Sequence, residues 1–182
     1  MKEAKPEILS SDVPFKGRKL EIQSQAISFG GRKSVVETVT HPGAVAILAF
    51  TPQGKVLLER QYRHSVGRYI YELPAGTLEP GEDPKECASR ELEEETGYTA
   101  DSLKEVGAMY TAPGYSSEVL HLFVARAGKH GGQRLEGDER ISVSAHSLSE
   151  ARRLVMGDGP FDGKSMVLLQ LAASDKALLD SR

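Results

Sequence analysis

The chain has 182 residues, enough for one domain with a substantial core, and its 23 basic and 26 acidic residues leave a formal net charge of −3. This near-neutral balance gives no electrostatic grip on nucleic acid or on a membrane surface, so we expect neither as a partner. A single cysteine cannot form an internal disulfide, and no apolar run is long enough for a signal peptide or a membrane span, so we expect a cytoplasmic protein.

Short β-strands are predicted in the amino-terminal part of the chain. Residues 19–27 and 34–40 are rich in alternating or β-branched residues, and Gly30 and Gly31 between them signal a turn. A small sheet of this kind is marginally stable unless something covers it. We therefore expect residues 1–39 to form a separate β-strand segment ahead of the main domain.

A fully buried strand is predicted at residues 44–50, where every residue is apolar. Residues 52–55 form a turn into a second strand at 56–59, a pattern that indicates a hairpin. Another strand is predicted at 69–73. The tripeptide 74–76 then leads into a markedly acidic stretch of the chain.

A helix is predicted from residue 84 to residue 96 of this acidic stretch. Asp83 is a good N-cap, and Pro84 suits the first helical position because its missing N–H would have no partner there. Gly97 is a natural C-cap because it tolerates the left-handed conformation that ends a helix.

Three carboxylates share one face of the predicted helix, because Glu91 lies three residues before Glu94 and four before Glu95. Like charges at this spacing oppose folding by roughly 0.2–0.5 kcal/mol per pair. A hard divalent cation would relieve the repulsion, since magnesium and its relatives choose oxygen ligands. Arg90 lies one turn from Glu86 and Glu94, and we expect it to pair with either.

Beyond this helix, residues 103–111 and 119–127 are predicted strands. The polar, proline-fixed segment 112–118 between them is typical of a turn at the edge of a site. The glycine-rich and charged segment 129–140 is predicted to be a loop that leads into a strand at 141–144.

Two more helices are predicted near the carboxyl terminus. Ser147 and Glu150 form a capping box that opens a helix ending near Met156. The last helix is predicted at residues 165–179. Its inward-facing positions are predicted to be Met166, Leu169, Ala173 and Ala177.

The stretch 76–98 resembles the Nudix box, the signature of the Nudix hydrolases. The fixed positions of that signature are matched by Gly76, Glu82, Arg90, Glu91, Leu92, Glu94, Glu95 and Gly97. Tyr98 stands where an aliphatic residue is usual, which affects local packing and not the chemistry. The resemblance implies a Nudix-type α/β/α sandwich with a mixed sheet over residues 40–182, and a small N-terminal antiparallel β-sheet. It also implies a homodimer in which the N-terminal strands reach the partner.

The resemblance further implies a hydrolase that depends on a divalent metal. Mg²⁺ or Mn²⁺ would be held by Glu91, Glu95 and the carbonyl of Ala75, with Glu94 as a further ligand. The general base that takes the proton of the attacking water would be Glu139, with Glu94 in reserve. Two more residues of the box would hold these carboxylates in place: Glu82 and Arg90.

Residues outside the box resemble the ADP-ribose pyrophosphatase branch of the family. In the arrangement Q-Y-R…E-L-P-A-G, Arg63 is similar to a phosphate-contacting arginine, and Glu72 to a substrate-side acid or a structural hydrogen-bonding residue. Pro113, sixteen residues after Gly97, marks this branch, and Gly114 follows it at the substrate. The implied reaction is hydrolysis of a nucleoside diphosphate sugar, with ADP-ribose yielding AMP and ribose 5-phosphate.

Two other functions remain open from the sequence. The chain could hydrolyse another nucleotide sugar such as GDP-mannose, because the residues that recognise the base are not evident. It could also be a non-catalytic nucleotide-sugar sensor, although a sensor would not need every metal carboxylate. The scattered histidines lack zinc-like spacing, and neither a G-x-S-x-G motif nor a P-loop is present.

Overall fold

The computed structural model of the chain describes residues 4–17, 20–135, 137 and 140–175. The chain divides into two compact units. Residues 1–43 and 110–119 form the first unit, and residues 44–109 and 120–182 form the second. Within the described residues, no helix is long and apolar enough to cross a membrane.

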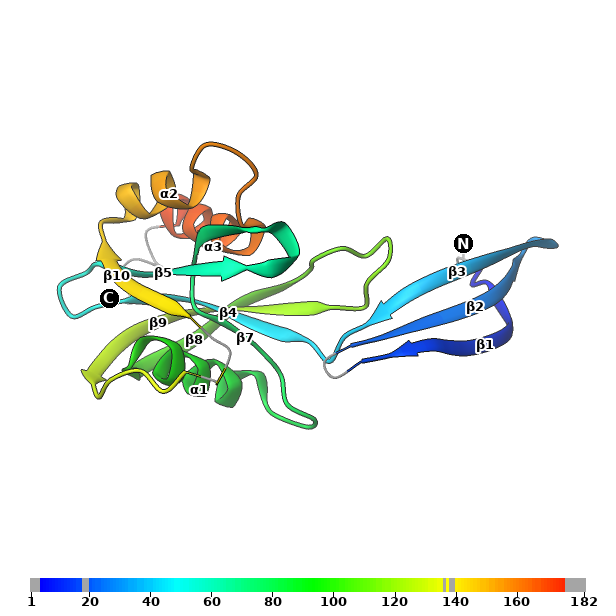
Figure 1. The fold of residues 1–182 in the computed structure, drawn as a ribbon, viewed down its shortest axis with the longest axis horizontal. Helices are drawn as coiled ribbons and strands as arrows, with labels where there is room; N and C mark the ends of the chain where they lie inside the picture. Colours follow the sequence, from blue (N-terminus) through cyan, green and yellow to red (C-terminus); the bar gives the residue numbers. More distant parts are fainter. Residues whose placement is uncertain (1–3, 18–19, 136, 138–139, 176–182) are drawn as a thin grey trace. The chain divides into compact units, whose positions relative to one another are not determined.

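The first unit contains a three-stranded antiparallel sheet in the order β1-β2-β3 (Figure 1). Its strands are β1 (Glu7–Lys16), β2 (Glu21–Phe29) and β3 (Arg32–Thr40). The predicted turn is present, with Gly30 and Gly31 at positive φ angles of 58° and 81°. Strand β1 was not predicted as a separate element, because its sequence lacks a regular polar and apolar alternation.

The second unit is built on a seven-stranded mixed sheet in which β10, β5, β4, β9 and β8 lie side by side, β6 pairs with β5 and β7 pairs with β4. Strands β4 and β9 are parallel, and the pairs β4–β5, β4–β7, β5–β6 and β5–β10 are antiparallel. The strand bounds are β4 (Ala44–Phe50), β5 (Val56–Arg63), β6 (Arg68–Glu72), β7 (Ala75–Thr77), β8 (Tyr98–Tyr110), β9 (Val119–His130) and β10 (Ile141–His146). A short 3-10 helix, His64–Val66, connects β5 to β6.

Strand β4 is buried along its whole length because both faces of the sheet are covered. Its side chains alternate between two hydrophobic clusters. Leu48 belongs to the cluster that contains residues of α2 (Leu148–Met156) and α3 (Gly163–Ser174). Its neighbour Ile47 belongs to the cluster that contains residues of α1 (Pro84–Thr96). This is why the segment reads as a continuous apolar run and not as an alternating one.

Helices cover the sheet on both sides, so the second unit is a three-layer α/β/α sandwich (Figure 1). Helix α1 (Pro84–Thr96) buries Leu92 against one face of the sheet. Helices α2 (Leu148–Met156) and α3 (Gly163–Ser174) cover the other face. The predicted α/β fold with an additional small antiparallel sheet is therefore confirmed.

The bounds of α1 agree with the sequence prediction because its end signals are local. The Asp83 side chain accepts a hydrogen bond from the Lys85 N–H at 2.8 Å. Gly97 ends the helix in the left-handed conformation, with φ of 78°. The predicted capping box at the start of α2 is also present, with both of its hydrogen bonds formed between Ser147 and Glu150.

Helix α3 differs from its prediction in its start and in its buried face. It begins at Gly163 with Asp162 as its N-cap, not at Ser165, and it ends at Ser174. Ala173 is exposed, so its predicted inward position is wrong, while Met166 is partly buried and Ala177 lies outside the described residues. The buried stripe follows the 3.6-residue period from a different start: Ser165, Leu168, Leu169 and Ala172.

The predicted hairpin of β4 and β5 is present only at its turn, where Phe50 pairs with Val56. Beyond that pair the two strands take different neighbours, because β7 pairs with β4, and β6 and β10 pair with β5. This divergence leaves the first residues of β4 free to pair with β7. It therefore places the tripeptide that follows β6 next to the acidic helix α1.

Candidate functional site

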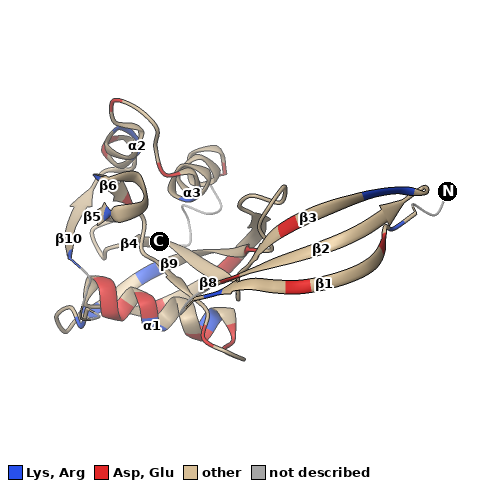
Figure 2. Cartoon of the chain, turned by 45° about the vertical axis from the view of Figure 1, so that its right-hand side comes forward, with Lys and Arg blue, Asp and Glu red and all other residues tan. Residues whose placement is uncertain are grey.

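Acidic residues make up much of helix α1 (Figure 2), and the three predicted carboxylates, Glu91, Glu94 and Glu95, share one side of it by their helical spacing. They differ in burial: Glu95 is only 3% exposed, whereas the side chains of Glu91 and Glu94 are 13% and 33% exposed. The helix therefore turns this acidic face partly toward the sheet and not wholly toward solvent.

Strand β7 lies directly against this acidic face. The Ala75 N–H donates a hydrogen bond to the Glu95 carboxylate at 2.9 Å. At Gly76, an added Cβ would stand 1.9 Å from the carboxyl carbon of Glu91, so no other residue fits there unless Glu91 moves. The strand and the helix thus meet at Ala75 and Gly76, the two residues that precede the acidic loop.

Arg90 holds the acidic residues together. Its Nε and Nη2 atoms donate to the two carboxylate oxygens of Glu82 at 2.9 and 3.0 Å, and Nη1 donates to Glu91 at 2.8 Å and to Glu94 at 3.2 Å. The predicted pairing with Glu94 is present. Among the described contacts Arg90 reaches Glu82 and not Glu86, because the loop before α1 folds back over the helix.

Carboxylate oxygens and a nearby backbone carbonyl are the ligand types that a hard divalent cation prefers. Among the described residues, however, no three acidic, histidine or cysteine side chains stand close enough together to hold a metal ion. Glu91 and Glu94 are both directed to Arg90. The donor chemistry therefore fits such a cation, provided that Glu91 and Glu94 turn from Arg90 toward it and the Glu91 carboxyl group leaves its place against Gly76.

A second charged cluster lies at the end of β6. Glu72 is 2% exposed and accepts two hydrogen bonds from Arg63, from Nε at 2.7 Å and from Nη2 at 3.0 Å. Lys164 donates to the same carboxylate and forms an ion pair with Asp162 at 3.0 Å. Two cations and two anions thus neutralise one another in a largely buried place.

Burial would raise the pKa of Glu72, but the hydrogen bond from Arg63 and the charge of Lys164 outweigh it, so the pKa lies below its ordinary value. Burial would lower the pKa of Arg63, but the hydrogen bond and charge of Glu72, with smaller contributions from Glu95 and Asp162, raise it overall. The charge of Glu95 contributes to the raised pKa of Arg63, so the acidic face of α1 lies near this second cluster.

Lys164, Asp162 and Ser165 were not singled out from the sequence. They form the start of α3, which was predicted to begin at Ser165, so Asp162 and Lys164 were assigned to the preceding loop. A recognisable signal was present: Asp162 precedes Ser165 by three residues, and its side chain accepts a hydrogen bond from the Ser165 N–H at 3.1 Å. Their meeting with Glu72 depends on the tertiary fold.

The loop that follows β9 is attached to the carboxyl end of α1. The Arg134 N–H donates to the Glu94 carbonyl at 2.8 Å, and the Gln133 side chain donates to the Glu95 carbonyl at 2.5 Å. The same Gln133 amide reaches the Ile141 carbonyl at 3.4 Å, where β10 begins. The predicted base Glu139 and its neighbours Glu136 and Asp138 lie outside the described residues.

Pro113 and Gly114 belong to the first unit, where they form a compact turn. The Tyr115 and Ser116 N–H groups both donate to the Ala112 carbonyl, at 3.0 and 2.8 Å. Nothing lies within 4 Å of a Cβ added at Gly114, so its surroundings within the described residues are open.

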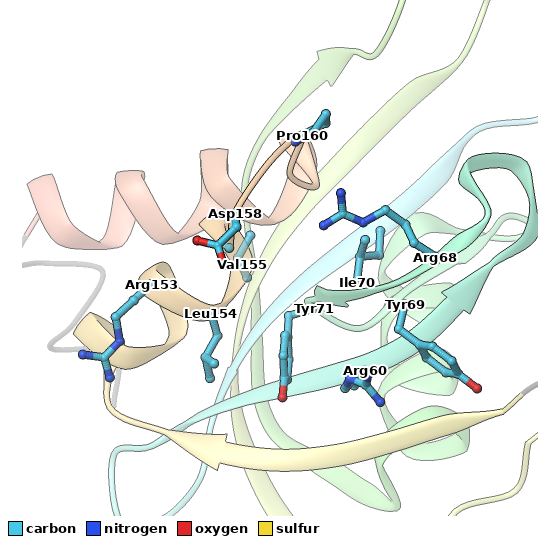
Figure 3. Close-up of a pocket in the computed structure, with 11 residues that line it drawn as sticks. Arg60, Arg68, Tyr69, Ile70, Tyr71, Arg153, Leu154, Val155, Asp158 and Pro160 are labelled. Carbon is cyan, nitrogen blue, oxygen red and sulfur yellow. The ribbon is translucent and has the colours of Figure 1, made fainter.

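A separate hollow of about 440 Å³ lies beside β6, next to the end of α2 and the connection to α3 (Figure 3). Arg60, Arg68 and Arg153 are on its rim, but their guanidinium groups point in different directions and do not converge on one point. None of the predicted site residues lines it. We therefore place the candidate site at α1, β7 and the start of α3.

Comparisons with known proteins cover most of the chain. A family model described as the NUDIX domain matches residues 40–166. The chain is 37% identical over 181 residues to the ADP-ribose pyrophosphatase of Bacillus subtilis (strain 168), covering 98% of each chain. It is 36% identical over 167 residues to the methanol dehydrogenase activator of Bacillus methanolicus, covering 90% of each. The crystal structure of an ADP compounds hydrolase matches with a TM-score of 0.79 and 26% identity over 94% of both chains.

The ion pair of Arg90 and Glu82 makes the free energy of unfolding depend on pH in the acid range. The hydrogen bond from Arg90 lowers the pKa of Glu82 to about 2, whereas the pKa of a glutamate in an unfolded chain is about 4.3. A lowered folded-state pKa stabilises the protein above the unfolded value, and this contribution is lost as the pH falls toward 2.

We therefore expect Glu82→Gln to lower the free energy of unfolding at pH 7, by on the order of 1 kcal/mol for a pair partly screened by solvent. The difference from wild type should shrink between pH 5 and the folded-state pKa of about 2. Urea unfolding midpoints across this range would measure it. A difference that stays constant with pH would contradict the assignment.

Proposed function

The chain belongs to the Nudix family of hydrolases, and from that premise we propose that it hydrolyses the diphosphate linkage of nucleoside diphosphate sugars. The preferred substrate is ADP-ribose, which yields AMP and ribose 5-phosphate. The observation that carries this proposal is the 37% identity to an ADP-ribose pyrophosphatase over 98% of both chains. The structural likeness to an ADP compounds hydrolase supports the same class of substrate.

Nudix hydrolases generally need divalent metal ions, and we propose Mg²⁺ or Mn²⁺ for this chain. Glu91, Glu95 and the carbonyl of Ala75 would hold the cation, with Glu94 as a further ligand. When bound, the cation would neutralise charge on the phosphate oxygens and make the attacking water more acidic. Gly76 allows the β7 backbone to approach Glu91, which supports this assignment.

Arg63 is the residue that we assign to the substrate phosphates. Its Nε and Nη2 atoms are directed to Glu72, while Nη1 has no hydrogen-bond partner in the described part of the chain and the side chain is 40% exposed. Arg63 can therefore donate to a phosphate oxygen without leaving Glu72. Glu72 is almost fully buried, which favours a role in orienting Arg63 over direct contact with substrate.

Glu82 and Arg90 keep the carboxylates of α1 in place. Arg90 touches Glu82, Glu91 and Glu94 at once, so it can balance their charge before a cation arrives. As the general base we propose Glu139, with Glu94 in reserve. Each would accept the proton of the water that attacks the diphosphate.

We further propose a homodimer formed through residues 1–39, with residues 40–182 as the hydrolase domain. The three-stranded sheet of the first unit leaves several large apolar side chains exposed, among them Phe15 at 52%, Phe29 at 55% and Val35 at 68%. Exposed apolar patches of this kind often mark protein interfaces. Pro113 and Gly114, in the same unit, would contact substrate.

Two other functions are tested by the substrate panel described below. One relative, 36% identical, is named a methanol dehydrogenase activator and not a pyrophosphatase, so similarity alone does not fix the substrate. Hydrolysis of another nucleotide sugar such as GDP-mannose is the nearest alternative. A non-catalytic nucleotide-sugar sensor is the alternative from a different class.

The substrate proposal is tested by a panel of ADP-ribose, GDP-mannose, other nucleotide sugars, ATP and capped RNA, each with and without magnesium. We expect the highest kcat/KM for ADP-ribose and no turnover in excess chelator. Chromatographic separation of the substrates and products gives the rates. Better turnover of ATP or capped RNA would overturn the branch assignment, and binding without turnover would favour a sensor.

The metal ligands are tested by Glu91→Gln and Glu95→Gln. Each should lower kcat/KM by at least about 100-fold, because a bound cation supplies several kcal/mol of charge stabilisation in the transition state. The melting temperature without metal should change little, since glutamine is a comparable helix former. Glu86→Gln, at an exposed position in the first turn of α1, is the matched control. Wild-type turnover in either variant would rule out that ligand.

The base is tested by Glu139→Gln, which should lower kcat by about 100-fold or more with a much smaller change in KM. Loss of the base should also flatten the acidic limb of the pH profile. Glu136→Gln and Asp138→Asn are controls from the same loop and should have milder effects. If Glu139→Gln keeps normal turnover while Glu94→Gln is inactive with metal bound, the base lies on α1.

The assembly is tested by sedimentation at assay concentration. Wild type should be a dimer, deletion of residues 1–38 should give a less active monomer, and Val35→Asp should weaken the dimer by placing a charge on the exposed apolar sheet. Glu37→Asp in the same strand preserves charge and serves as the control. A wild-type monomer, or full activity after the deletion, would refute the proposal.

A further inference from the structure

The first turn of α3 forms hydrogen bonds with two consecutive residues that lie just before β7, Glu72 and Leu73. The Lys164 ammonium donates to the Glu72 carboxylate. The Ser165 hydroxyl oxygen accepts the Leu73 N–H at 2.7 Å, in a place where Ser165 is completely buried. One helical turn thus contacts both the side chain of one residue and the backbone of the next.

These contacts continue directly into the acidic face of α1. Pro74 follows Leu73, and its carbonyl accepts the Ile47 N–H of β4 at 2.8 Å. Ala75 then donates to Glu95, and Gly76 lies against Glu91. The segment from residue 72 to residue 76 is therefore held at successive points by α3, by β4 and by α1.

The first turn of α3 is itself held rigidly. Asp162 accepts hydrogen bonds from the Ser165 N–H and hydroxyl group and pairs with Lys164 at 3.0 Å. The Lys164 side chain is only 17% exposed, so the ammonium has little room to leave its two carboxylates. If Lys164 lost its charge, Arg63 would be the one cation left among the described members of this cluster to neutralise Glu72 and Asp162.

That loss would draw Arg63 further toward the buried acids. Arg63 already uses two of its nitrogen atoms on Glu72 and has Nη1 left for a ligand. An arginine that carries more of the charge balance of a buried pair is less available to an anion that arrives from solvent. In the site proposed above, Lys164 would therefore control how well Arg63 binds phosphate.

We propose that Lys164 and Ser165 are positioning residues for hydrolysis. Lys164 acts through Glu72 on Arg63. Ser165 acts through Leu73 on the backbone of β7, which faces Glu91 and Glu95. This inference rests on the proposed function of the same site. Neither residue touches the substrate or the cation in this assignment. The two act on different partners, so their variants should have different effects.

The Lys164 arm compares Lys164→Met with Lys164→Arg. Methionine keeps an unbranched stem and removes the charge, and it should raise the KM for ADP-ribose about tenfold while kcat changes less than about threefold. Arginine keeps the charge and should restore most of the affinity. Lys104→Met, at an exposed position on β8 without a described ion pair, is the matched control. Calorimetric binding of inorganic pyrophosphate to the magnesium-loaded protein is the readout that needs no turnover.

The Ser165 arm compares Ser165→Ala with Ser165→Thr. Alanine removes the acceptor of the buried Leu73 N–H, so β7 should shift and Mn²⁺ binding, measured by electron paramagnetic resonance of the unbound ion, should weaken about tenfold. Threonine keeps the hydroxyl and should retain most of the affinity. Ser174→Ala, at the exposed end of α3, is the matched control. Pyrophosphate binding should change less in this arm than in the Lys164 arm.

Each arm can fail separately from the proposed function. If Lys164→Met leaves both KM and pyrophosphate affinity within about twofold of wild type, its positioning role is overturned. If Ser165→Ala keeps wild-type Mn²⁺ affinity, or fails to fold, Ser165 serves stability only. If wild type hydrolyses no nucleotide sugar but both binding shifts occur, the proposed function fails, and what stands is that Lys164 positions the anion-binding Arg63 and Ser165 the cation-binding backbone of β7.

Discussion

The close contact between β7 and α1 is the constraint on which the rest of the site depends. Gly76 leaves no room for a side chain because the Glu91 carboxyl group occupies that space, and the Ala75 N–H is committed to Glu95. The helix can approach this closely only because β4 and β5 diverge after their turn, which leaves an edge of β4 for β7 to pair with. The backbone of β7 thus lies next to α1, where the family resemblance implies that the Ala75 carbonyl is a metal ligand.

Charge balance explains how so acidic a helix can fold with its carboxylates partly covered. Arg90 contacts Glu82, Glu91 and Glu94, and its hydrogen bond to Glu82 keeps that carboxyl group ionised down to a pKa of about 2. A partly buried acid without such a partner would favour its neutral form. The same arginine occupies the carboxylates that the proposed cation would need, so the cation would have to compete with Arg90 for them.

The cluster around Glu72 follows the same rule with different residues. Burial of this carboxylate is offset by Arg63 on one side and by Lys164 on the other. Because Arg63 is held through two nitrogen atoms, the direction of its remaining nitrogen is set by the fold and not by a flexible side chain. Preorganised donors of this kind bind a charged ligand with less loss of conformational entropy.

The sequence by itself determined the features that depend on neighbours along the chain. Helix α1 was predicted with correct ends because Asp83 and Pro84 act on its first turn and Gly97 on its last. Strand β4 was predicted because a run of seven apolar residues needs a sheet that is covered on both faces. The family followed from the spacing of acids around Arg90. Only the tertiary structure decided that Lys164 meets Glu72 across 92 residues, and that Ser165 accepts the Leu73 N–H. No local signal records such contacts, because they arise from how α3 packs on the sheet.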